Sequence, residues 1–329
     1  MIAFSIFAVI SVFLVFGDNI SSAYVNETRA VARNSEGYAI REFGNVEPTP
    51  RQKDLMNLAH KNFLKSGKGI VGTTVIDTVI HVVKPTANSF RNEAEYFEQQ
   101  QINVLNKAFR NNGMGFKFNL VKIKTHVNRA YWNEPVQDGS TMKQVTHVGD
   151  FSTLNIWFTN VGPQLGYATF PAFDYVKQDG IVIYHGTVKG GSFYPFNLGA
   201  TLIHEVGHWL GLPHTFENGC DPGDGIADTA PEKRAAFGCP VGRDTCPGDG
   251  LEDPIHNFMD FTDDACMWEF TPGQALFAHS QWEAFRAPGA SNAPSMVPTS
   301  IPAAPTNKSG KMGKVGKKMG KKMGKVGKT

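Results

Sequence analysis

The chain has 329 residues, of which 41% are hydrophobic, and this is enough for a globular domain with a substantial core. Its formal net charge of +2 hides an uneven distribution, because nine of its 32 Lys and Arg residues lie in 308–329, where no acidic residue occurs. The remaining residues, 1–307, hold 23 basic against 30 acidic side chains. Such a composition excludes a polytopic membrane protein and a wholly disordered chain.

The first segment of the chain, MIAFSIFAVISVFLVFG, is apolar from Ile2 to Phe16 apart from two serines. It is too short to cross a bilayer comfortably, and the SSA that ends at Ala23 has the small residues that a signal peptidase needs. We therefore expect a signal peptide over residues 1–23, a secreted protein, and no transmembrane segment in the mature form. An uncleaved membrane anchor is the alternative, since the segment begins without Lys or Arg.

Residues 24–70 are polar, contain one short helical pattern, PRQKDLMNLAHKNFLKSG, and are predicted to be a pro-segment or an N-terminal arm. Residues 71–286 carry the apolar patterns of a folded domain. Helical spacing is found at 89–113, 197–212 and 272–286. Strand patterns are found at 73–83, 116–127, 154–161 and 179–186. This order predicts an α/β (α+β) fold in which helices pack on a twisted mixed sheet.

The four cysteines fall within one stretch that is rich in Gly, Asp and Pro: Cys220, Cys239, Cys246 and Cys266. In an oxidising compartment such thiols form disulfides, so we expect two bridges, and the sequence leaves three pairings open. A thiolate metal site is the alternative, which the absence of a CxxC pair disfavours. Because apolar periodicity fades after Gly211, we expect bridges and bound ions to order this stretch.

The segment HEVGHWLGLPH has the spacing HExxHxxGxxH. On a helix, His204 and His208 lie one turn apart on the same face, so both imidazoles can reach a single ion. Gly211 can adopt the left-handed conformation that ends a helix, which lets His214 return as a third ligand. Three nitrogens leave one coordination position open, as a catalytic zinc requires. Glu205 stands beside the first ligand, where it can take a proton from a metal-activated water.

A buried helix with chance polar residues is the alternative, but five fixed positions in a helix-to-turn context make it a poor explanation. The extended motif resembles that of the metzincin metallopeptidases, whose other hallmark is a methionine-bearing turn, and NFMDF offers Met259 for it. Further segments narrow the likeness: GDGIADTA, GCPVGRDTC and DPIHNFMDFTDDACMWEFTPGQ. With these, residues 150–286 resemble the pappalysin-type, or cytophagalysin, family of secreted metallopeptidases.

The resemblance implies a metzincin-like fold, with a twisted sheet and two long helices above a zinc cleft and a loop-rich, disulfide-bridged lower subdomain. It implies that residues 71–286 are the catalytic domain, and that the bridges join Cys220 to Cys246 and Cys239 to Cys266. Family members bind calcium in the loops after the third histidine. The candidates here are Asp224, Asp228 and Thr229, for which solvated turns are the alternative.

Two positions depart from the family pattern. Two residues after Met259 the family usually has a tyrosine that helps to stabilise the oxyanion, and this chain has Phe261. The loss of such a donor typically lowers the rate by about 10- to 1,000-fold. IREFGN lies where the family's pro-segment often carries a cysteine that caps the zinc, and Phe43 offers no sulfur.

These observations predict a secreted zinc-dependent endopeptidase that hydrolyses peptide bonds through a metal-activated water. Its predicted zinc ligands are His204, His208 and His214, and its predicted general base is Glu205. The alternative is a metzincin-fold binding or inhibitory module, catalytically weakened by Phe261. We expect protein or peptide substrates, a monomer, and no specific recognition of nucleic acid.

Two further segments bear on binding. LGYATFP, residues 165–171, is a candidate edge of the cleft, where an extended peptide could pair through its backbone; an interior strand is the alternative. Residues 287–329 pass from a Pro/Ala-rich to a Lys/Gly-rich composition, for which we expect disorder. Their lysines are suited to anionic surfaces, and a flexible solubilising end without a partner is the alternative.

Overall fold

The computed structural model describes residues 31–41, 47–89, 98–133, 140–172 and 174–290. The predicted signal peptide, Phe43 and the lysine-rich part of the tail lie outside these residues. None of the described helices combines the length and the apolar character that crossing a bilayer requires.

Five strands of the described chain form one mixed sheet in the order β2-β1-β3-β5-β4. β1 (Thr74–Lys84) pairs in parallel with β2 (Phe116–Val127) and with β3 (Leu154–Thr159). β3 pairs in parallel with β5 (Ile181–Tyr184), and β4 (Gly166–Ala168) runs antiparallel to β5. The strands β3 and β5 are buried along their whole length, as is typical of strands covered on both faces. β4 lies at the end of the strand order and is therefore an edge strand.

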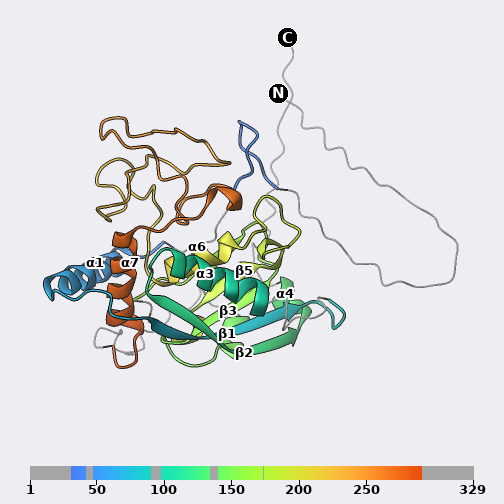
Figure 1. Ribbon diagram of the computed structural model, residues 1–329. Helices are drawn as coiled ribbons and strands as arrows, with labels where there is room; N and C mark the ends of the chain where they lie inside the picture. The colour runs from blue at the N-terminus through green and yellow to red at the C-terminus, as the bar shows by residue number, and fades with distance from the viewer. Residues whose placement is uncertain (1–30, 42–46, 90–97, 134–139, 173, 291–329) are drawn as a thin grey trace, which may run out of the picture. The chain divides into compact units, whose positions relative to one another are not determined.

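Two helices, α3 (Asn103–Asn111) and α6 (Ala200–Trp209), lie along one face of this sheet (Figure 1). A π-helical turn, Glu98–Ile102, precedes α3. α1 (Pro50–Lys65) packs against α7 (Pro272–Gln281), which continues as the π-helical turn Trp282–Arg286. Shorter elements complete the described chain: α4 (Arg129–Asn133), α5 (Thr141–Thr146) and three 3-10 turns at Val176–Gln178, His185–Thr187 and Asp264–Cys266. The predicted fold class is thus confirmed.

α6 is shorter than the helix predicted at 197–212. Its start is fixed by Gly199, which has a left-handed φ of 94°. The carboxylate of Asp264 accepts hydrogen bonds from the backbone N–H groups of Leu198 at 2.8 Å and Ala200 at 3.2 Å. A carboxylate at a helix N-terminus satisfies free N–H groups and interacts favourably with the helix dipole. The same Asp264 forms a fully buried ion pair with Arg41, so the N-terminal residues contact the start of α6.

α1 begins at a capping box in which Thr49 and Gln52 bond reciprocally, with Pro50 in the first turn. Its buried face contributes Met56 and Ala59 to the main hydrophobic core. Removing residues 24–70 as a whole would uncover that core. The choice between a pro-segment and an N-terminal arm for residues 24–70 stays a prediction.

The chain between α6 and the 3-10 turn at Asp264–Cys266 has no helix and no paired strand beyond an isolated bridge from Asn257 to Glu269. Its own hydrophobic cluster consists of Ala236, Ile255 and Cys266 only. Two disulfides, Cys220–Cys246 and Cys239–Cys266, cross this stretch in the pairing that the family resemblance implies. Covalent and polar contacts therefore take the place of a larger apolar core here.

Candidate metal centre

Three histidines converge at the C-terminal end of α6. His204 and His208 are completely buried, and His214 is 6% exposed. The Nε2 atom of His208 lies 2.9 Å from that of His204 and 3.0 Å from that of His214. These three side chains form a group that could hold one metal ion.

The position of the proton on the His204 and His208 rings follows from the partner of each Nδ1 atom. Nδ1 of His204 lies 2.6 Å from the carbonyl oxygen of Phe258, and Nδ1 of His208 lies 2.7 Å from that of Leu212. A carbonyl oxygen only accepts hydrogen bonds, so each Nδ1 carries the proton and each Nε2 presents a lone pair. Burial also lowers the pKa of both rings, that of His208 to about 4, which keeps them neutral. Two lone pairs this close repel each other unless a cation lies near both.

The return of the chain to His214 is produced by the helix end that the sequence predicts. Gly211 has a φ of 95° and donates its N–H to the carbonyl of His208 at 2.8 Å. Leu212 donates to the carbonyl of Gly207 at 2.9 Å, which completes a Schellman motif. The same turn aims the carbonyl of Leu212 at His208, so one backbone feature ends the helix and orients a ring.

Glu205 is fully buried beside this triad, and neither of its carboxylate oxygens has a hydrogen-bond partner within the described part of the chain. Burial raises the pKa of Glu205 well above its usual value, and the positive charge of Arg41 opposes that shift. A Cβ atom on Gly166 would lie 2.9 Å from Oε1 of Glu205. The edge strand β4 therefore runs directly past this carboxylate.

Met259 lies beneath α6 and is completely buried. Its backbone N–H donates to the side chain of Asn257 at 2.9 Å, which fixes the turn. Its sulfur packs against Gly207 so closely that a Cβ atom at that position would overlap it. Glycine in the helix between the two histidines thus permits the methionine to approach.

Gly207→Ala is expected to lower the free energy of unfolding by about 1–2 kcal/mol. Overpacking of this kind costs about 1–3 kcal/mol, which outweighs the gain of about 1 kcal/mol in helix propensity. Chemical denaturation in the presence of chelator measures the difference. Gly248→Ala is the matched control, because nothing lies within 4 Å of a Cβ atom there. Equal stability of the two variants would show that overpacking against Met259 costs no more than the gain in helix propensity.

Phe261 packs directly on the candidate metal centre. Its ring centroid lies 4.9 Å from that of His214 and 5.8 Å from that of His204. It also meets Phe216 edge-on at 4.9 Å, while Phe216 stacks on His214. The position where the family has tyrosine therefore forms an aromatic wall of the site in this chain.

The predicted calcium candidates make other contacts. Asp228 accepts hydrogen bonds from the Thr271 hydroxyl at 2.8 Å and from the Gly273 N–H at 2.7 Å, at the start of α7. Burial raises the pKa of Asp224 to about 7. Thr229 is buried near them. Calcium binding at these residues stays a prediction.

Sequence reasoning missed the groups that orient the candidate ligands. The carbonyls of Phe258 and Leu212 are backbone atoms, so no residue type marks them. Asn257 is signalled only by its place two residues before Met259. Gly207 had a usable signal, because glycine inside a helix costs stability and often marks a close approach.

The chain is similar to several known proteins. The family model described as pregnancy-associated plasma protein-A matches residues 139–280. An extracellular metalloprotease of Pyricularia oryzae is 43% identical over 223 residues, which cover 64% of this chain and 76% of that protein. One from Colletotrichum graminicola is 37% identical over 266 residues, which cover 78% of this chain and 92% of that protein.

Two solved structures of mirolysin from Tannerella forsythia are also similar. Mature mirolysin in complex with a cleaved peptide has a TM-score of 0.54 at 29% identity and covers 65% of this chain and 92% of its own. A promirolysin variant has a TM-score of 0.59 at 28% identity and covers 72% of this chain and 90% of its own.

These findings show that the protein is an extracellular metalloendopeptidase. Its cofactor is a metal, and its substrates are proteins or peptides. Within that class the chain belongs to the pregnancy-associated plasma protein-A family, the pappalysins. No comparison supports the alternative of a binding or inhibitory module.

Proposed function

We propose that the protein is a zinc-dependent endopeptidase in which His204, His208 and His214 bind the ion and Glu205 acts as the general base. The observation that carries the proposal is the convergence of the three Nε2 atoms, with that of His208 lying 2.9 Å from that of His204 and 3.0 Å from that of His214, while carbonyl partners keep the Nε2 atoms of His204 and His208 unprotonated. Zinc suits this donor set, because three imidazole nitrogens leave one position open for chemistry.

When bound, zinc supplies a Lewis acid that polarises a carbonyl group and lowers the pKa of water. Glu205 takes the proton of the attacking water and delivers it to the nitrogen of the leaving amine. Its two oxygens make no other hydrogen bond within the described residues, so they are available to that water. The carbonyls of Phe258 and Leu212 keep His204 and His208 in the ligating tautomer.

The substrate is proposed to lie along β4. This strand pairs with β5 on one side only, and Gly166 brings its backbone next to Glu205. An extended peptide can add to such an edge through main-chain hydrogen bonds, which recognise any sequence. Mature mirolysin, to which this chain is similar, has been solved with a cleaved peptide, in keeping with a peptide substrate.

Metal analysis tests the proposal. Purified mature protein is expected to contain about one zinc ion per chain, to lose hydrolysis in a strong chelator, and to regain it when zinc is added. Mass spectrometry of peptides released from a denatured proteome measures the activity and the sequence preference together. Folded protein without stoichiometric transition metal, or hydrolysis that is undiminished in chelator, would overturn the assignment.

We also propose that the lysine-rich tail binds anionic surfaces. The proposal rests on the sequence, in which 308–329 contain nine lysines and no acidic residue, whereas the rest of the chain has an acidic excess. Attraction of this kind is electrostatic and weakens as salt screens it.

Truncation after Ala287 is expected to abolish retention on an anionic matrix at low salt, while hydrolysis of a soluble peptide stays unchanged. Elution by a salt gradient, run beside the full-length chain, measures the effect. An unchanged elution profile would leave the tail as a solubilising end only.

A further inference from the structure

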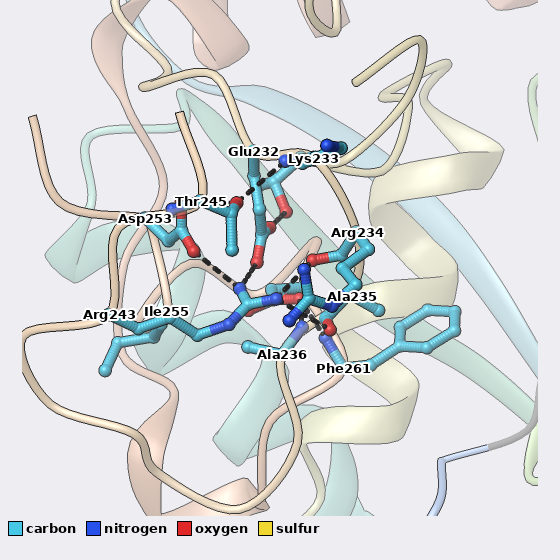
Figure 2. A network of polar contacts seen from close by, with 12 residues as sticks. Glu232, Lys233, Arg234, Ala235, Ala236, Arg243, Thr245, Asp253, Ile255 and Phe261 are labelled. Atoms are coloured by element: carbon cyan, nitrogen blue, oxygen red, sulfur yellow. Dashed lines mark hydrogen bonds and ion pairs between the residues drawn. The ribbon is translucent and has the colours of Figure 1, made fainter. Parts of the chain in front are cut away.

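The stretch that follows α6 is held by a buried polar network (Figure 2). Glu232 is completely buried, Asp253 is 5% exposed, and both accept hydrogen bonds from Arg243. Arg243 lies between Cys239, which belongs to one disulfide, and Cys246, which belongs to the other. The separate apolar cluster of these loops has only three residues, so the polar network contributes much of the contact between them.

Both terminal nitrogens of the Arg243 guanidinium group, Nη1 and Nη2, form hydrogen bonds. Nη1 pairs with Glu232 and, at 2.7 Å, with Asp253. Nη2 donates to the backbone carbonyls of Arg234 at 2.7 Å and Ala235 at 3.1 Å. Figure 2 shows the group lying between these acceptors. The planar fork of arginine can serve four acceptors in fixed directions, whereas the ammonium of lysine cannot.

One branch of the network leads to the third histidine. The carboxylate of Glu232 accepts a hydrogen bond from the Thr215 hydroxyl at 2.9 Å, and Thr215 directly follows His214. The N–H of Thr215 donates to the carbonyl of Met259 at 3.3 Å. Thr215 therefore joins the His214 loop to the methionine turn, and Glu232 fixes Thr215.

A second branch leads to the methionine turn itself. The segment held by Nη2 continues to Ala236, whose N–H donates to Asp260 at 3.0 Å. The same oxygen of Asp260 accepts the N–H of Phe261 at 2.7 Å. Asp260, the residue after Met259, thus links Ala236 to Phe261, which packs against His214.

From this geometry we propose that Arg243 is a positioning residue for the metal centre. It sets the place of His214 through Glu232 and Thr215, and the place of Met259 and Phe261 through Ala236 and Asp260. The hydrogen-bond partners of the Arg243 guanidinium are Glu232, Asp253 and the carbonyls of Arg234 and Ala235, so its effect on the histidines passes through these residues. The inference rests on the proposed function, in which His214 is a zinc ligand.

Arg243→Lys tests the inference, because it keeps the positive charge and removes the fork. Zinc affinity, measured by competition with a chromophoric chelator, is expected to fall by about 10- to 100-fold, as is typical when groups that orient a ligand are lost. The value of kcat is expected to fall with little change in KM. Arg234→Lys is the matched control, because the exposed side chain of Arg234 stands in the same loop and only its carbonyl is used.

Thr215→Val is the second variant, since it removes the hydroxyl that Glu232 holds and keeps the shape of the side chain. Its zinc affinity is also expected to fall below that of wild type. This variant tests the inference if Arg243→Lys does not fold. Zinc affinity equal to wild type in the folded variants overturns the inference, even if their stability is reduced. A wild-type chain that binds no zinc instead overturns the proposed function, so the two failures are distinguishable.

Discussion

Glu205→Gln is expected to lower kcat/KM for peptide hydrolysis by about 100- to 10,000-fold, the usual contribution of a positioned general base. Glutamine matches glutamate in size but its amide cannot accept the proton of water. The histidines and their carbonyl partners are untouched by the change, so the zinc content is expected to stay at the wild-type value. Initial rates and metal analysis on the same preparation check both statements.

Glu252→Gln serves as the matched control, because it makes the same chemical change at an exposed position in the loops. Its rate is expected to equal that of wild type. If Glu205→Gln keeps the wild-type rate with zinc bound, Glu205 is not the base. If the variant loses zinc as well as activity, its rate is measured again after it has been loaded with zinc.

Asp179→Ala is expected to lower the free energy of unfolding by about 3–5 kcal/mol, because it leaves a buried guanidinium without its counter-charge. Asp179 is completely buried and pairs with Arg286 at 2.9 Å. It also accepts hydrogen bonds from the Trp209 indole at 3.1 Å and the Thr169 hydroxyl at 2.6 Å. The carboxylate thus joins the end of α6 to the chain beyond β4 and to the C-terminal helical turn.

Chemical denaturation measures this loss, with Glu283→Ala as the control. Glu283 forms an ion pair with Lys68 at 2.7 Å, and the two side chains are 42% and 59% exposed. Water already solvates such a pair, so the expected loss is below about 1 kcal/mol. Similar losses for the two variants would mean that burial does not govern the strength of the Asp179 pair.

Much of the candidate metal centre follows from local rules that a sequence displays. The helical period places His204 and His208 on one face, and Gly211 ends the helix so that His214 can return. The strands were likewise predictable from runs of apolar residues. These features depend on neighbours within a few residues, where backbone geometry decides the outcome.

Contacts between distant parts of the chain were not predictable. α6 starts at Ala200 because Asp264, 64 residues away, takes its N–H groups. The strand β4 is too short to show a period in the sequence, yet it lies within LGYATFP, which was expected to form an edge, and the structure places it at the end of the strand order. Arg243 lies in a loop of low apolar content, where its sequence resembles that of any solvated turn. Its role becomes visible only when the partners are placed around it.

The two disulfides interleave: Cys239 falls inside the loop that Cys220 and Cys246 close, and Cys246 falls inside the loop that Cys239 and Cys266 close. Such crosslinks are made in oxidising compartments and are rare in the cytosol. A newly made chain in the cytosol therefore lacks the two disulfides that hold the loops after α6 beside the candidate metal centre. The loops after α6 are therefore expected to reach their crosslinked form only after export.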